Sequence, residues 1–197
     1  MPSGPEPAGR RRVGVLALQG DFEAHATLLE ALGAEPREVR VPADLDGIDA
    51  LIIPGGESTV MTLGIEREGL AEPLRALIGS GVPVLGTCAG MIMLDRDHLG
   101  VLDISTRRNA FGRQLRSFEA DVELHGVEGG PMHAVFIRAP WVEERGEGVE
   151  VLGSVDEHPV AIRQGGVLAV SFHPELTGDD RLHRLLLSAN GRGEQRA

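Results

Sequence analysis

Short apolar runs alternate with segments of helical character through the first half of the chain. Residues 13–18, 36–41, 50–53 and 82–86 have strand composition. Helices are expected at 22–32, after Ser58 as the N-cap and at 70–78. Strands separated by helices form βαβ units, whose strands pair in parallel. We therefore expect an α/β fold with one doubly wound, mostly parallel sheet flanked by helices in three layers.

The second half is richer in strands, and no long linker divides it from the first. Strands are expected at 117–124, 134–138, 149–155, 160–164 and 167–172, followed by a last helix that begins after Asp179 or Asp180 and runs to about residue 189. We expect one domain over residues 13–190, a flexible leader over 1–12 and a frayed tail over 191–197.

Charge and hydropathy exclude several classes of partner. The net charge of −11 argues against a nucleic acid as the main partner, although Arg10–Arg12 form one basic cluster in the leader. No apolar run approaches the roughly 20 residues that span a bilayer. The chain has one cysteine and therefore no internal disulfide, and we expect a cytoplasmic location.

Lysine and tyrosine are absent, and all 19 basic residues are arginine. A Schiff base with pyridoxal phosphate or an aldehyde substrate is therefore excluded for the side chains, as is a Walker A loop. The histidines other than His173 have no convincing metal-ligand spacing, so we expect no metal site and no cofactor.

Three expected strands end in residues that can carry chemistry. They lead into Pro54-Gly55-Gly56-Glu57-Ser58, into Gly86-Thr87-Cys88-Ala89-Gly90 and into His173-Pro174-Glu175. Ligand sites in doubly wound sheets form at the carboxyl ends of the parallel strands. We expect these three segments to meet there.

Cys88 lies in the cysteine version of the G-x-S-x-G nucleophile elbow. A thiol exposed at the end of a sheet and at the start of a helix is favoured as thiolate, which is the nucleophilic form. A lone cysteine is also common as a small buried hydrophobic residue. The pattern therefore indicates a nucleophile only together with its partners.

His173 and Glu175 are suitable as the general base and the group that orients it. Pro174 favours an extended His173, and side chains two residues apart in an extended segment point the same way. For the oxyanion, the candidates are backbone N–H groups of the Gly55-Gly56 turn, assigned to Gly56, and of Ala89.

These three segments together resemble class I, triad-type glutamine amidotransferases. Other segments are similar to the family of glutaminase subunits of pyridoxal 5'-phosphate synthase, over about residues 13–189: Leu18-Gln19-Gly20, residues 108–114, 117–120 and 135–140, and Phe172–Thr177. The resemblance implies a flavodoxin-like fold in three layers.

The resemblance also implies roles. Cys88 would be the nucleophile, His173 the general acid/base and Glu175 the residue that orients His173. The L-glutamine site would be lined by Gly56, Glu57, Ser58, Arg108, Ile137 and Arg138. The implied reaction is hydrolysis of glutamine to glutamate and ammonia, with the ammonia passed to a synthase subunit in a heteromeric lyase complex for vitamin B6 biosynthesis. The alternatives are a glutaminase of a different amidotransferase, a related cysteine hydrolase and a catalytically silent scaffold subunit.

Overall fold

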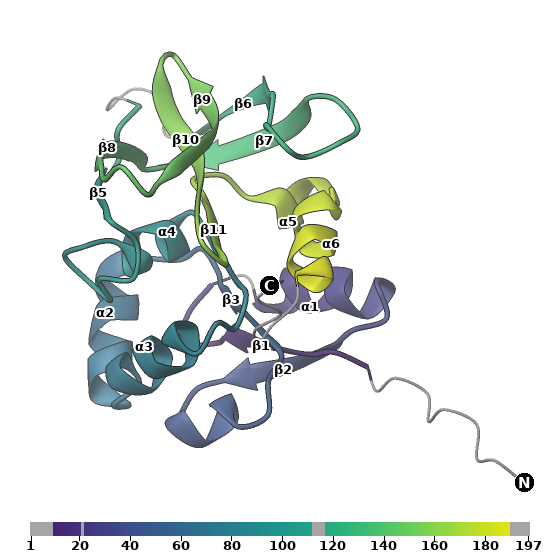
Figure 1. Ribbon diagram of the computed structural model, residues 1–197, viewed down its shortest axis with the longest axis vertical. Coiled ribbons are helices and arrows are strands. Elements are labelled where there is room, and N and C mark those ends of the chain that lie inside the picture. The colour runs from purple at the N-terminus through teal and green to yellow at the C-terminus, as the bar shows by residue number, and fades with distance from the viewer. Residues whose placement is uncertain (1–9, 21, 112–116, 190–197) are drawn as a thin grey trace, which may run out of the picture.

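A mostly parallel sheet crosses the middle of the molecule in the order β2-β1-β3-β4-β11-β10-β9 (Figure 1). The computed structural model describes residues 10–20, 22–111 and 117–189. Within them β2, β1, β3, β4 and β11 are parallel neighbours, and β10 and β9 continue the sheet antiparallel. The expected doubly wound α/β architecture is confirmed.

The elements follow one another as β1 (Arg12–Leu16), α1 (Phe22–Ala31), β2 (Glu35–Val39), the short 3₁₀ helix η1 (Pro42–Leu45), β3 (Ala50–Ile53), α2 (Ser58–Arg67), α3 (Ala71–Gly79), β4 (Val84–Thr87), α4 (Ala89–Leu94), β5 (Ile104–Arg107), β6 (Ser117–Val122), β7 (Met132–Ile137), β8 (Trp141–Arg145), β9 (Glu150–Val155), β10 (His158–Gln164), β11 (Val167–Val170), α5 (Pro174–Thr177) and α6 (Arg181–Ser188).

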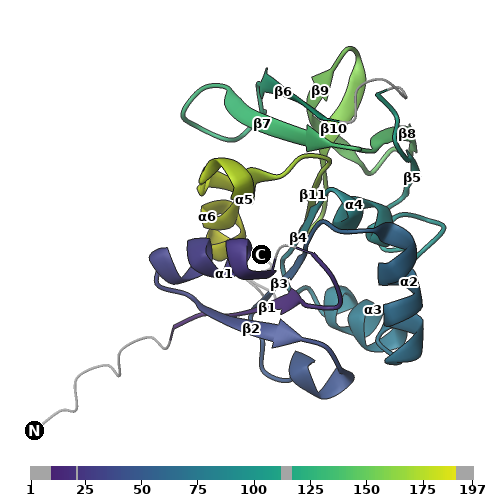
Figure 2. The same cartoon turned by 180° about the vertical axis from the view of Figure 1, so that it is seen from behind.

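Helices cover both faces of the sheet. Helices α2, α3 and α4 lie on one face, and α1 and α6 lie on the other, as Figures 1 and 2 show from opposite sides. Alternation along β3 explains the arrangement, since Leu51 and Ile53 pack with the first group and Ala50 and Ile52 with the second. All four side chains are fully buried, so the strand is an unbroken apolar run.

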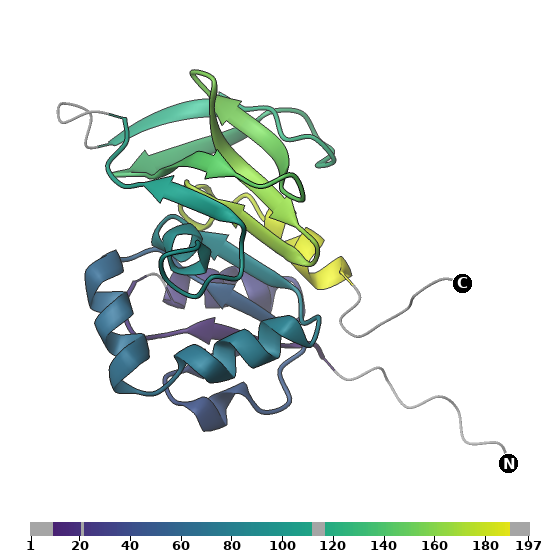
Figure 3. The same cartoon turned by 60° about the vertical axis from the view of Figure 1, so that its left-hand side comes forward.

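Smaller antiparallel pairs lie above this sheet. Strand β6 pairs with β7 and β5 pairs with β8, and Figures 1 and 3 show both pairs beside β9 and β10, the antiparallel end of the main sheet. Strands β5 and β8 were not predicted. They are short, their pairing has a register shift between Ser105 and Thr106, and β8 carries three consecutive charged residues at its end.

The boundaries near the chain ends differ slightly from expectation. Strand β1 begins at Arg12, inside the segment expected as a leader, and Arg11 donates hydrogen bonds to the carbonyls of Leu187 and Ala189 beside α6. The rest of the expected leader, residues 1–9, and the expected tail lie outside the described residues. Among the helices described, none is long and apolar enough to cross a membrane.

Candidate active site

A cavity of about 530 Å³ opens at the carboxyl edge of the parallel strands. The chain leaves β1 to form β2 on one side and β3 on the other, so the strand order reverses between β1 and β3. Doubly wound sheets form ligand sites at such a point. The cavity is lined by Gln19, Gly20, Gly56, Glu57, Ser58, Cys88, Ala89, Ile92, Arg108, Asn109, Ile137, Arg138 and His173.

Cys88 occupies a strained turn between β4 and α4. Its φ of 50° and ψ of −110° are rare for a residue with a side chain. Such a turn is characteristic of nucleophile elbows. The thiol is buried, with 6% of the residue exposed, so the expectation of an exposed thiol was wrong. Its Sγ lies 3.8 Å from the carbonyl oxygen of Ile137.

The glycines of the elbow have a steric cause. A Cβ at Gly90 would lie 1.8 Å from the carbonyl oxygen of Ile53, and one at Gly86 would lie 3.0 Å from Gly90 backbone atoms. Strand β3, strand β4 and the start of α4 therefore approach too closely for any side chain at these positions. The Gly-x-Cys-x-Gly spacing is what allows this packing.

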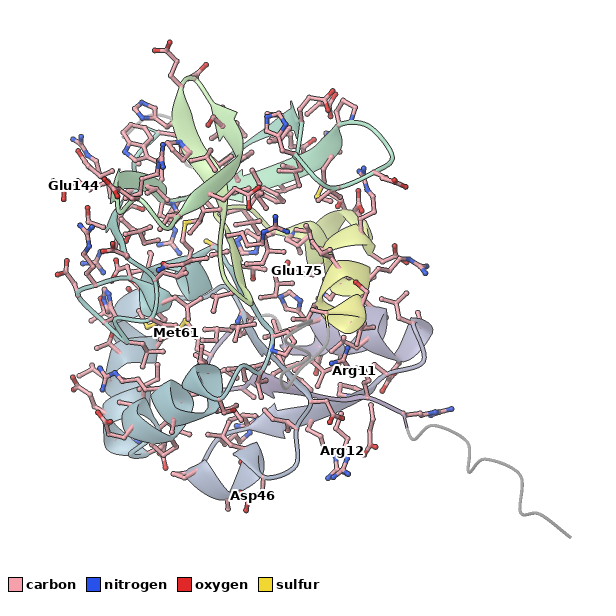
Figure 4. All side chains as sticks on the ribbon, in the orientation of Figure 1. Arg11, Arg12, Asp46, Met61, Glu144 and Glu175 are labelled. Atoms are coloured by element: carbon pink, nitrogen blue, oxygen red, sulfur yellow. The ribbon has the colours of Figure 1, made fainter. Side chains whose placement is uncertain are left out.

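His173 and Glu175 form a buried pair. His173 Nδ1 lies 2.6 Å from Glu175 Oε1, and both side chains are nearly inaccessible. The contact was predicted, but its geometric reason was wrong. The chain after Pro174 is not extended, because Pro174 begins the short helix α5, and the single turn of helix folds Glu175 back beneath His173. Figure 4 shows Glu175 in the interior, beside α6.

Strand pairing joins the two halves of this constellation. Strands β4 and β11 are parallel neighbours with Thr87 opposite Val170, and the Cys88 amide donates to the Val170 carbonyl at 2.8 Å. The His173 amide donates to Val135 of β7 at 3.0 Å. Cys88 and His173 therefore line the same cavity although 84 residues separate them in the chain.

Glu57, not Ser58, is the N-cap of α2. The Glu57 carboxylate accepts hydrogen bonds from the amides of Val60 and Thr59 at 2.9 and 3.1 Å, and these bonds lower the pKa of Glu57. The expectation that Ser58 caps the helix was wrong. Ser58 is instead buried, and its hydroxyl accepts a hydrogen bond from Arg108 Nη1 at 2.8 Å. That bond holds the guanidinium at the edge of the cavity.

The opposite wall has two residues in the left-handed region. Asn109 has a φ of 50° and Arg138 a φ of 46°, and both line the cavity beside Ile137. Backbone strain is concentrated at functional sites, and here Cys88 is the third such residue around one cavity. The elbow pattern predicted a strained backbone at Cys88, whereas nothing in the sequence analysis pointed to the dihedral angles of Asn109 and Arg138.

All the residues expected in the site reach the cavity except Glu175, which lies behind His173. Gln19 and Gly20 were not assigned to the site. Gln19 Oε1 accepts a hydrogen bond from the Glu57 amide, and a Cβ at Gly20 would lie 1.8 Å from the carbonyl oxygen of Gly55. This close approach explains the Gln19-Gly20 motif after β1. Within the described residues, no group of three or more His, Cys, Asp or Glu side chains could hold a metal ion.

Comparison with known proteins agrees with this geometry. The model of the SNO glutamine amidotransferase family matches residues 15–190. The chain belongs to this family. Two curated relatives are named pyridoxal 5'-phosphate synthase subunit PdxT. The protein from Frankia alni is 56% identical over 185 residues, with 89% of this chain and 93% of that protein covered. The protein from Acidothermus cellulolyticus is 55% identical over 196 residues, with 92% and 95% covered.

Solved structures give the same result for this member of the SNO family. A crystal structure described as a glutamine amidotransferase superposes with a TM-score of 0.83 at 50% identity, covering 89% of this chain and 96% of that one. A Thermoplasma acidophilum protein described as a putative GMP synthase subunit superposes with a TM-score of 0.69 at 17% identity, covering 91% and 94%. The second likeness shows the shared fold alone.

Proposed function

We propose that the chain hydrolyses L-glutamine to L-glutamate and ammonia as the glutaminase subunit of a pyridoxal 5'-phosphate synthase. The observation that carries the proposal is that Cys88, at a strained elbow, lines one cavity with His173, which is paired with the buried Glu175 at 2.6 Å. A nucleophile, a base and a group that orients the base are the parts an acyl transfer requires.

The reaction proceeds through a covalent thioester. The Cys88 thiolate attacks the side-chain amide carbon of glutamine, and His173 gives its proton to the departing ammonia. Water then attacks the γ-glutamyl thioester, with His173 taking up a proton, and glutamate leaves as the thiol reforms. Glu175 holds His173 Nδ1–H, so that Nε2 serves the reaction.

Backbone amides of Gly56 and Ala89 stabilise the oxyanion. Ala89 is the first residue of α4, and its amide has no acceptor within the helix. Gly56 has a φ of 150°, which favours glycine, and the Gly55-Gly56 peptide can reorient at little cost. We propose that this peptide turns toward the substrate when the synthase docks. Equal turnover with and without the synthase would contradict that step.

Two arginines and the start of α2 bind the amino-acid end of glutamine. Arg108 and Arg138 line the cavity, and guanidinium groups bind carboxylates through paired, charge-assisted hydrogen bonds. Gly56, Glu57, Ser58 and Ile137 line the remaining wall. The Glu57 carboxylate adds a negative charge that suits the substrate ammonium group.

Ammonia is useful only when it is delivered, and the relatives are named as subunits of a pyridoxal 5'-phosphate synthase. We propose a heteromeric lyase complex in which this chain releases ammonia and the synthase uses it. We expect the complex in the cytoplasm, where reducing conditions preserve the single thiol.

The test is ammonia release from glutamine by Cys88→Ala and Cys88→Ser, each assayed with and without the synthase. Both variants should lose at least about a thousandfold of kcat, since the oxyanion donors alone cannot form a thioester. A glutamine-analogue electrophile should label the unmodified chain at Cys88 and neither variant. Persistent ammonia release by Cys88→Ala would refute the mechanism. A wild-type chain that binds the synthase but releases no ammonia would indicate a scaffold subunit.

A further inference from the structure

A chain of buried polar side chains continues from Glu175 into the molecule. Glu175 Oε2 lies 3.5 Å from Nε2 of His25 on α1. His25 Nδ1 lies 2.9 Å from Nε2 of His183 on α6. His25 and His183 are both 0% exposed, and the two rings lie 5.1 Å apart. Neither histidine lines the cavity, so they are separated from substrate by Glu175 and His173.

We propose that His25 is a positioning residue of the glutaminase: its Nε2–H holds the second oxygen of Glu175, and His183 holds His25 in that tautomer. The inference rests on the proposed function, because the group that His25 positions is the carboxylate that orients His173.

The direction of the protons follows from the geometry. The 3.5 Å separation between His25 Nε2 and Glu175 Oε2 is longer than an ordinary hydrogen bond, so the contact is mainly electrostatic. An ionised carboxylate is stabilised by an N–H that faces it and destabilised by a nitrogen lone pair, so this contact favours the proton on Nε2 of His25. A neutral His25 then has a bare Nδ1, and His183 must donate to it through Nε2–H. The Thr87 hydroxyl, 3.4 Å from His25 Nε2, can accept a share of the same proton.

The far end of the chain agrees with this direction. No hydrogen-bond partner of His183 Nδ1 is found among the described residues. A bare nitrogen is tolerated there far better than an N–H group, which would be left without an acceptor. Burial also lowers the pKa of His183 to about 4, so the ring is neutral and carries one proton, on Nε2.

The groups that face His25 come from three elements. Helix α5 presents Glu175, β4 presents the uncharged Thr87, and α6 presents His183. Near the start of α6, Asp179 and Asp180 act on His183, but each is paired with an arginine, Arg181 and Arg184 respectively. Of Glu175, Thr87 and His183, Glu175 is the group that carries a charge at neutral pH.

The consequence is a carboxylate held from both sides. His173 Nδ1 lies 2.6 Å from Oε1, and His25 lies against Oε2. Both contacts favour the ionised carboxylate and fix its plane, and an ionised Glu175 stabilises the imidazolium that His173 forms during the reaction. Loss of His25 should therefore weaken chemistry rather than glutamine binding.

The first test uses the unmodified protein. Nitrogen NMR of ¹⁵N-histidine-labelled chain distinguishes the two tautomers of each ring. His25 and His183 should both be Nε2–H tautomers that stay neutral between about pH 6 and 8. A His25 ring protonated on Nδ1 would overturn the proposal.

The second test compares His25→Leu with His25→Gln in the complex with the synthase. The leucine removes the donor, whereas the glutamine amide restores an N–H near the position of Nε2. His25→Leu should lower kcat about ten- to a hundredfold with little change in KM, and the basic limb of the pH profile should move to lower pH because the imidazolium is less stabilised. His25→Gln should recover most of both.

The double variant His25→Leu/His183→Leu separates positioning from stability. His25→Leu leaves the His183 ring without the nitrogen it contacts in the wild type. The double variant removes that ring as well, so the melting temperature should return toward the wild-type value while kcat stays low. A kcat and a pH profile of a folded His25→Leu chain equal to those of the wild type would overturn the proposal and leave the glutaminase assignment intact. Recovery of kcat in the double variant would do the same.

Discussion

At the scale of single residues, the active site depends on places where no side chain fits. Gly90 lies against the carbonyl oxygen of Ile53, and Gly20 lies against that of Gly55. A Cβ on either glycine would lie only 1.8 Å from that oxygen. Both carbonyls belong to the segment that runs from β3 into the Gly55-Gly56 turn. The glycines therefore allow the loops after β1, β3 and β4 to pack directly against one another.

Gly90→Ala should destabilise the fold, because the new methyl group meets rigid backbone rather than a mobile side chain. We expect a loss of at least about 2 kcal/mol in the free energy of unfolding, measured by urea denaturation. Gly79→Ala is the matched control. Gly79 ends α3 with open space around its Cβ position, and that variant should be unchanged or stabilised by up to about 1 kcal/mol. Similar stability of the two variants would contradict the steric explanation.

At the scale of elements, α6 buries a titratable ring in its contact with α1. His183 shares its face of the helix with the buried Leu182 and Leu186, and it meets His25 there. The pKa of His183 falls from 6.5 to about 4 because burial penalises the charged ring. The packing of α6 is therefore sensitive to acid.

Stability should fall as the pH falls from about 7 to about 5. In that window the unfolded chain binds a proton at His183 and the folded chain does not, so protons favour unfolding. The lost contribution is about 2 kcal/mol, and the effect ends below about pH 4, where both states are protonated. Urea denaturation should show a smaller loss for His183→Gln, which keeps a donor but cannot titrate. Equal losses in the two proteins would show that His183 titrates normally.

At the scale of the whole molecule, composition divides the chemistry between two chains. The sequence contains no lysine, so no side chain can form an imine with a sugar phosphate. Any step of pyridoxal 5'-phosphate synthesis that needs an imine with a side-chain amine must therefore use a residue of the synthase. This chain contributes no side-chain amine to such a step.

Borohydride should therefore trap no side-chain adduct on this chain. When the two subunits are mixed with a pentose phosphate and reduced, intact-mass measurement should find the adduct on the synthase alone. Adding glutamine together with the wild-type chain should change the amount of trapped adduct on the synthase. Adding glutamine together with the Cys88→Ala chain should leave that amount unchanged. An adduct mapped to a side chain of this subunit would contradict the division.

Local signals predicted much of the fold and of the site. Unbroken apolar runs such as Ala50–Ile53 and the glycines beside Cys88 are local features, and they correctly indicated parallel strands and an elbow. Strands β5 and β8 were missed because long-range pairing, rather than an alternating apolar pattern, stabilises them. The helical turn that begins at Pro174 was not predicted. Proline keeps the preceding residue, His173, out of the helical region, but it does not keep the residues after it extended.

The histidines of α1 and α6 had a weaker signal. Each lies on the buried face of its helix, beside Ala26 and Leu29 or beside Leu182 and Leu186. A polar ring among apolar neighbours indicates a buried partner, but a helical pattern cannot identify that partner.

The sequence by itself determined the α/β class, the strand-end motifs and the exclusion of imine chemistry, because these depend on residue type and on spacing over a few residues. Only the tertiary structure decided which groups meet. The pairing of β4 with β11 places Cys88 and His173 on one cavity, and the packing of α1 and α6 on one face of the sheet joins His183 to His25 and His25 to Glu175. Such contacts join residues far apart in the chain, and they form because burying both faces of the sheet leaves the helices no other place to pack.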